Sequence, residues 1–223
     1  MSAAIPLSPP SDEVAIRAAL SIPRTDTYVR ATAGDTARAV SLYGWNARVS
    51  AALMLPAHFA EVTTRNAVSE ALTTVYGANW PWNSTFVNSL PTPGGRTFKP
   101  RRELQAVAAR EPTTGKVIAE LKFAFWQHMF TSRYDVRLWA PHIMTLFPHA
   151  AGLTVPVLRA RIHDDLDTIR ALRNRIAHHE PVITRNLGDD LACMLDLVEL
   201  RSPPTATWVR SMEQVTAILP TRP

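Results

Sequence analysis

Apolar side chains recur along most of this chain at spacings of three and four residues, the period of a helix with one buried face. The pattern is clearest in two long stretches. The first, 36–55, has its apolar side chains at Ala39, Val40, Leu42, Tyr43, Ala47, Val49 and Leu53. The second, 156–179, has Val157, Leu158, Ile162, Leu166, Ile169, Leu172 and Ile176. Nowhere does a sustained period of two appear, so the sequence predicts an all-α helical bundle without a sheet.

Proline and glycine mark the expected ends of the helices. Pro56 is typical of a first helical turn and Gly77 of the residue after a helix, so we expect a second helix between them. Further helices are predicted at 12–20, 98–110, 115–130, 187–200 and 205–219, with short helical turns in 134–150. Residues 1–11 contain three prolines and are predicted to be a disordered tail, which leaves 12–223 as one domain.

Composition narrows the class of protein. The chain has 223 residues, 46% of them hydrophobic and 19% charged, which is enough apolar material for a core and too little charge for disorder. A net charge of +5 excludes an acidic protein. No apolar stretch approaches the roughly 18–20 residues that span a bilayer. The N-terminus also lacks the basic start of a secretory signal, so we expect a cytoplasmic protein without a membrane span.

The cysteine and histidine content argues against a metal site. The single cysteine, Cys193, excludes an intramolecular disulfide and a cysteine-based zinc site. It lies in an apolar run, where we expect it to be buried rather than nucleophilic. His142, His149 and His163 do not have metal-ligand spacing, so neither a metal nor a cofactor is predicted. His58 and His128 are expected to be partly buried helix residues.

The candidate chemistry lies at the end of the second long helix. Arg170, Asn174 and His178 are four residues apart and share one helical face, with Arg173 beside them. Histidine can transfer protons in both directions near neutral pH, and arginine suits a phosphate, so the cluster indicates phosphodiester chemistry. A structural interpretation stays open, because histidine is favoured at helix C-termini and arginines pair with nearby aspartates on helix surfaces.

The residues Arg173-Asn174-x-x-x-His178 resemble the R-N-x-x-x-H motif of the HEPN superfamily, helical-bundle proteins of which many are metal-independent endoribonucleases. Further segments resemble, in the same order, the Abi-like proteins, a bacterial group named for phage abortive infection. These segments lie at 20–28, 42–46, 61–67, 76–80 and 115–126. The resemblance covers roughly residues 16–200. Ala60 and Thr64 stand where the family usually has leucine.

The resemblance implies that an RNA 2′-hydroxyl attacks the adjacent phosphate, without a metal. His178 would be the base or acid, Arg173 the phosphate-binding cation and Asn174 an orienting amide. One motif supplies one such histidine, so a two-fold homodimer would bring two together. His179 is a weaker candidate, because adjacent side chains on a helix diverge by about 100°.

A second polar cluster comprises Glu61, Arg65 and Asn66. Glu61 and Arg65 are four residues apart, so they form either an intrahelical ion pair or part of the same cleft as His178. Tyr43, Trp45 and Asn46 are interpreted as structural, with Asn46 satisfying nearby backbone groups.

Basic residues accumulate between 96 and 122. We expect the RNA backbone to contact Lys99, Arg101, Arg102 and Arg170, since nonspecific RNA affinity comes from neutralised phosphates. A solvated helix face is the alternative for this run.

Three functions therefore compete. The first is an abortive-infection or toxin-type endoribonuclease, which would need a regulator such as an antitoxin, a small RNA or a phage trigger. The second is a non-catalytic RNA-binding or phage-sensing module with the HEPN fold. The third is a helical protein that only binds other proteins.

Overall fold

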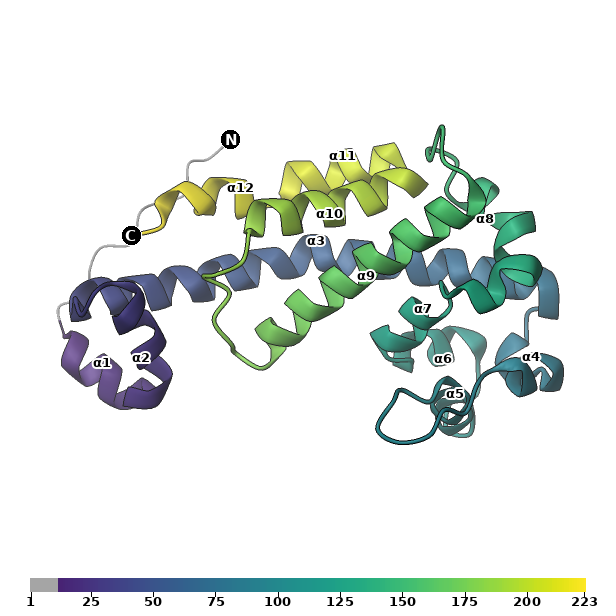
Figure 1. Cartoon of the computed structure of the whole chain (residues 1–223), viewed down its shortest axis with the longest axis horizontal. Coiled ribbons are helices and arrows are strands. Elements are labelled where there is room, and N and C mark those ends of the chain that lie inside the picture. Colours follow the sequence, from purple (N-terminus) through teal and green to yellow (C-terminus); the bar gives the residue numbers. More distant parts are fainter. Residues whose placement is uncertain (1–11) are drawn as a thin grey trace.

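The computed structural model describes residues 12–223, and no strand occurs in that range. This confirms the all-α prediction. The longest helix, α3 (Thr36–Tyr76), extends along most of the molecule, and the other helices pack around it (Figure 1). The predicted tail, 1–11, lies outside the described residues.

Helix α3 begins and ends as its sequence predicts but does not break in the middle. Asp35 caps its start by accepting the Arg38 backbone N–H at 2.9 Å, and Gly77, at φ +85°, ends it. The predicted break at Pro56 is wrong: the helix continues through this residue. The proline removes one backbone hydrogen bond. Its ring is buried, however, and apolar residues before and after it, Leu53 and Ala57, enter the same core, so packing holds both halves together.

Three groups of helices surround α3 (Figure 1). The short helices α1 (Glu13–Leu20) and α2 (Ile22–Ala31) pack against its beginning. Helices α10 (Leu187–Arg201), α11 (Pro203–Met212) and α12 (Val215–Ile218) follow one side of it. Near its end lie α4 (Ser84–Ser89), α5 (Pro100–Ala108), α6 (Thr114–Glu120), α7 (Phe123–His128) and α8 (Ala140–Leu146).

Helix α9 (Val155–Ala177) crosses α3 obliquely and connects these groups (Figure 1). It starts beside α8 and ends near α2, on the other half of the molecule. Its predicted apolar face is buried at Leu158, Ile162, Leu166, Ile169 and Leu172. Short helical turns at Trp80–Trp82, Ser132–Tyr134, Asp135–Trp139 and Leu219–Thr221 complete the fold.

The core includes several large aromatic side chains whose polar ends are satisfied. Trp45 is 2% exposed and its Nε1 donates to the Ile218 carbonyl at 3.0 Å, which confirms its structural role. Trp139 is fully buried and donates to the Met129 carbonyl at 2.7 Å. These two hydrogen bonds fix the orientations of the indole rings in the core.

Two predicted helices are each divided in the structure. The stretch 115–130 forms α6 and α7, because Leu121 and Lys122 are extended and turn the chain so that both helices reach the core. The stretch 205–219 forms α11 and α12. Glu213 ends the first, and its carboxylate accepts the Thr216 backbone N–H in the first turn of the second at 3.0 Å.

Individual burial predictions had mixed outcomes. His128 is partly buried as predicted, whereas His58 is exposed on the outer face of α3. Cys193 is half-buried rather than fully buried. None of the helices within 12–223 combines the length and hydropathy needed to cross a bilayer.

Candidate active site

The end of α9 has a geometry that the sequence pattern did not predict. The last helical residue is Ala177, and His179 adopts the left-handed conformation at φ +55°. The His179 N–H donates to the Ile176 carbonyl at 2.9 Å, and the Glu180 N–H to the Arg175 carbonyl at 2.8 Å. This pair of bonds is the Schellman motif, in which glycine is the usual left-handed residue. Here the position holds an imidazole.

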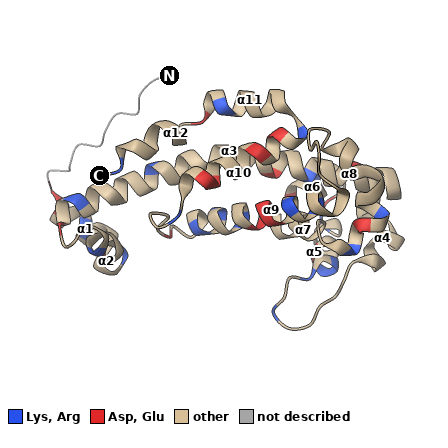
Figure 2. Cartoon of the chain, turned by 45° about the horizontal axis from the view of Figure 1, so that its top comes forward, with Lys and Arg blue, Asp and Glu red and all other residues tan. Residues whose placement is uncertain are grey.

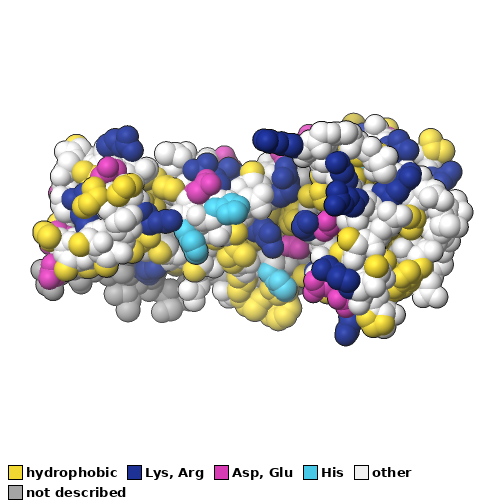
Figure 3. All heavy atoms as spheres, turned by 90° about the horizontal axis from the view of Figure 1, so that it is seen from below, with side chains coloured by type: hydrophobic (Ala, Val, Ile, Leu, Met, Phe, Trp, Pro, Cys, Tyr) yellow, Lys and Arg dark blue, Asp and Glu magenta, His cyan; other side chains and the backbone are white. Residues whose placement is uncertain are grey.

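The two histidines line one pocket against α2. The pocket has a volume of about 430 Å³ and lies between the beginning of α2 and the segment that follows α9. Its polar lining includes Arg24, Thr27, Tyr28, His178, His179 and Glu180. Both histidines are exposed. Histidine side chains reach the surface near the middle of the face viewed in Figure 3, the face on which the end of α9 lies in Figure 1.

Arg24 and Tyr28 bring a cation and a phenol into this pocket. They are one turn apart on α2 and therefore face the same side. One terminal nitrogen of Arg24 donates to the His179 carbonyl at 2.9 Å, which ties α2 to the histidine segment. Tyr28 is 2% exposed, and burial together with the nearby Tyr43 raises its pKa to about 12. The phenol therefore keeps its proton at neutral pH.

The segment behind the histidines is tied down by two further contacts. The Arg175 guanidinium donates twice to the Pro181 carbonyl, at 3.3 and 2.9 Å. The Val182 N–H donates to the Asn46 side-chain oxygen at 2.8 Å in a buried position. The two ends of the turn are thus fixed to α9 and α3, and the turn itself is fixed to α2.

Arg173 and Asn174 are placed differently from His178. Both are half-buried on the last turns of α9, where Figure 2 shows several basic residues, and neither lines the pocket. Within residues 12–223 their side chains form no hydrogen bond or ion pair. The structure therefore brings together His178, His179, Arg24 and Tyr28. The roles of Arg173 and Asn174 stay predictions.

The cluster of Glu61, Arg65 and Asn66 lies in the middle of α3. Glu61 is fifteen residues beyond Asn46, about 22 Å along a helix that rises 1.5 Å per residue, and none of the three lines the pocket. No ion pair joins Glu61 to Arg65 within the described residues, and the Arg65 Nε is buried without a hydrogen-bond partner. Asn66 is exposed. The predicted ion pair is therefore not formed, and a role of these residues beside His178 stays a prediction.

Two of the four predicted RNA-binding cations hold the fold together. Arg170 donates to Gln127 on α7 and to Asp167, at 2.7 Å each. The bond from Arg170, together with one that the Gln127 side-chain amide donates to the same carboxylate at 2.9 Å, lowers the pKa of the Asp167 carboxyl. Arg101 donates to the carbonyl oxygens of Leu90 and Asn88. Both guanidinium groups therefore make contacts that join parts of the fold.

The other two cations, Lys99 and Arg102, line a second hollow at the opposite end of the molecule. Its volume is about 380 Å³, and Arg96 and Lys122 also line it. One acid is present there, Glu103, whose carboxylate is 3.0 Å from the Lys122 ammonium. Figure 2 shows basic residues on the loop before α5 and at the start of that helix. This hollow has an excess of positive charge.

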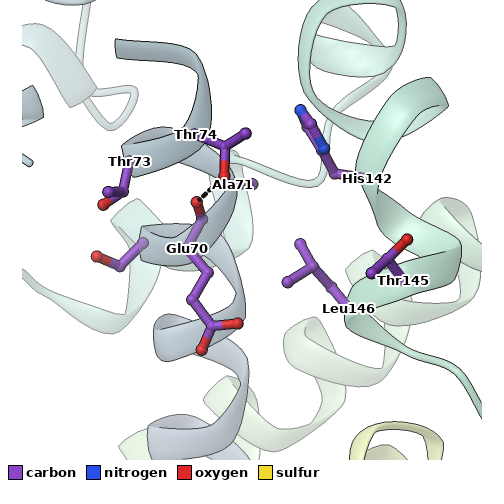
Figure 4. A pocket seen from close by; sticks show the side chains of 8 residues that line it. Glu70, Ala71, Thr73, Thr74, His142, Thr145 and Leu146 are labelled. Carbon is purple, nitrogen blue, oxygen red and sulfur yellow. Dashed lines mark hydrogen bonds between the residues drawn. The ribbon is translucent and has the colours of Figure 1, made fainter. Parts of the chain in front are cut away.

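A third hollow, of about 420 Å³, lies between the end of α3 and α8 (Figure 4). It contains His142 and Glu70, but their side chains do not point toward one another. The Glu70 carboxylate is 2.5 Å from Arg201 and is therefore already paired. Compared with this hollow, the pocket lined by His178 and His179 has two histidines as candidate proton-transfer groups.

Comparisons with protein-family models, curated proteins and solved structures returned no match for the chain. Within 12–223, no three histidine, cysteine, aspartate or glutamate side chains are grouped as metal ligands.

Proposed function

We propose that this protein is a metal-independent endoribonuclease of the abortive-infection or toxin type, acting at the pocket beside His178. The observation that supports the proposal is that two exposed histidines and an arginine line one pocket. The resemblance of Arg173-Asn174-x-x-x-His178 to the HEPN motif also assigns His178 to the chemistry, whereas the other two motif residues, Arg173 and Asn174, do not line this pocket.

The chemistry needs three kinds of group. A neutral imidazole takes the proton of an RNA 2′-hydroxyl, whose oxygen then attacks the neighbouring phosphorus. The bond to the 5′-oxygen breaks, and that oxygen receives a proton from an acid. A guanidinium balances the charge that develops on the phosphate oxygens. The products are a 2′,3′-cyclic phosphate and a 5′-hydroxyl, and His178 is the proposed base or acid.

The proposal also includes a surface that binds the RNA substrate and a regulator that controls the activity. The hollow lined by Lys99 and Arg102 supports contact with an RNA backbone, because its excess positive charge attracts phosphates. A homodimer, and a regulator such as an antitoxin or small RNA, remain part of the proposal through the resemblance.

The test compares the wild type with His178→Ala on labelled RNA in EDTA. The matched control is His149→Ala, because His149 is also exposed but lies in the turn before α9. Circular dichroism first establishes that all three are folded. We expect the wild type and the control to leave cyclic phosphate ends and His178→Ala to be at least about 100-fold slower, the lower range for losing one acid–base group.

Equal cleavage by all three proteins would indicate a contaminating nuclease and refute the role of His178. RNA binding without cleavage by any of them would favour the non-catalytic RNA-binding module.

A further inference from the structure

The positions of His178 and His179 differ from those of neighbours on a helix. On a helix the two side chains would diverge by about 100° and could not serve one site. His179, however, has left the helix at φ +55°, and both residues line the same pocket. Because of this turn, the divergence of adjacent helical side chains no longer argues against His178 and His179 acting at one site.

The left-handed turn is also a strained place for a histidine. Residues with a Cβ are disfavoured there, and a Schellman turn is made most easily with glycine. Five hydrogen bonds hold the strained backbone in place: two within the turn, one from Arg24 and two from the Arg175 guanidinium to Pro181. Strained residues that their surroundings hold in place occur often at functional sites.

Arg24 completes the set of groups from outside the motif. It comes from α2, and its single hydrogen bond to the His179 carbonyl uses one of its five N–H donors. No carboxylate within the described residues pairs with it, and Glu180, the one acid lining the pocket, is 3.7 Å from Arg175. The guanidinium is exposed at the pocket, so it is able to bind a phosphate there.

We infer that one subunit holds a complete site for phosphodiester cleavage, in which His178 and His179 are the acid–base pair and Arg24 binds the phosphate. The inference rests on the proposed function. It differs from the expected homodimeric site in one respect, because the second imidazole comes from the same subunit and not from a partner. The ligand is the phosphodiester of a single RNA strand.

The proton balance closes within the pair. The neutral imidazole of one histidine takes the 2′-hydroxyl proton as the new P–O bond forms. The imidazolium of the other gives its proton to the 5′-oxygen as that P–O bond breaks. The pair ends with its protonation states exchanged, and proton exchange with water restores them.

Mixing two inactive variants tests whether the pair belongs to one chain. His178→Ala and His179→Ala are each assayed alone, and again after being unfolded and refolded together at a ratio of 1:1. If one chain carries the pair, each variant loses at least about 100-fold in cleavage rate, and the mixture is no more active than its components.

If the pair is shared between the subunits of a dimer, half of the refolded dimers are mixed and one of their two sites is intact. The mixture then recovers about a quarter of the wild-type rate, which would overturn the inference but not the ribonuclease assignment. Undiminished cleavage by His179→Ala would also overturn it. A wild type that cleaves no RNA would refute the proposed function itself.

A non-cleavable ligand tests Arg24 separately from catalysis. RNA with 2′-deoxy substitutions lacks the attacking hydroxyl, so its affinity can be measured directly. We expect Arg24→Ala to weaken binding about 10-fold, Arg24→Lys to restore part of it, and Arg30→Ala, an exposed arginine on the same helix, to have no effect. Equal affinities for Arg24→Ala and Arg30→Ala would remove Arg24 from the site.

Discussion

The side-chain oxygen of Asn46 accepts the backbone N–H of Val182 at 2.8 Å, across 136 residues of sequence. Asn46 is 8% exposed and Val182 is fully buried. This bond joins the middle of the first half of α3 to the segment that carries His178 and His179. It satisfies a backbone donor that would otherwise be buried without a partner.

Asn46→Ala should therefore destabilise the protein and loosen the histidine segment. Leaving the Val182 N–H unpaired costs about 1–3 kcal/mol of unfolding free energy. Urea unfolding followed by circular dichroism measures this, and RNA cleavage should fall in parallel. Asn66→Ala, at an exposed position of the same helix, should change stability by less than about 0.5 kcal/mol. Equal stability of the two variants would show that the Asn46 bond contributes nothing.

His179→Gly should separate stability from activity. Glycine relieves the left-handed strain, so the unfolding free energy should rise by up to about 1 kcal/mol, while RNA cleavage falls with the loss of the imidazole. Ala33→Gly is the matched control, because Ala33 has φ +52° in a turn outside the pocket. It should gain similar stability and keep full activity. Loss of stability in His179→Gly would show that its side chain serves packing instead.

His128 should make the folded state sensitive to acid. Burial lowers its pKa below the usual 6.5, and Arg133 and His163 add to this by charge repulsion. Its Nε2 is buried and has no hydrogen-bond partner within 12–223. The unfolded chain therefore takes up a proton more readily than the native state, so stability falls as the pH decreases below about 6.5.

The thermal midpoints of wild type, His128→Gln and the exposed-site control His58→Gln at pH 7.5 and pH 5.0 check this expectation. His128→Gln should show the smaller decrease on acidification, and His58→Gln should behave as the wild type does. Identical decreases in all three would mean that His128 does not contribute.

Cys193 should be unreactive in the native state. Burial raises the pKa of its thiol to about 12, with the nearby Asp165 acting in the same direction. Since the thiolate is the reactive form, a thiol reagent at pH 8 should modify the native protein slowly. In urea it should modify one thiol per chain at once. Rapid reaction before unfolding would contradict the raised pKa of the half-buried thiol.

The local sequence pattern was sufficient to predict the helices but not all of their interruptions. Helical periodicity, the Asp35 cap and Gly77 predict where α3 begins and ends, because these signals act over one or two turns. Pro56 has a strong local preference for a helix start, yet the helix continues. Burial of Leu53 and Ala57 in a shared core outweighs the one lost hydrogen bond, and packing of this kind depends on distant residues.

In the candidate site, too, local sequence signals predict some features and tertiary packing decides the others. The sequence by itself determined that an all-α chain has His178 and His179 at the end of a helix, since helical spacing and the following Pro181 are local features. Only the tertiary structure decided which groups meet there. Arg24 reaches His179 from 155 residues away, and His179 turns out of the helix because contacts from α2, α3 and α9 hold a strained backbone. No spacing rule encodes those contacts, because they form only when the whole core packs.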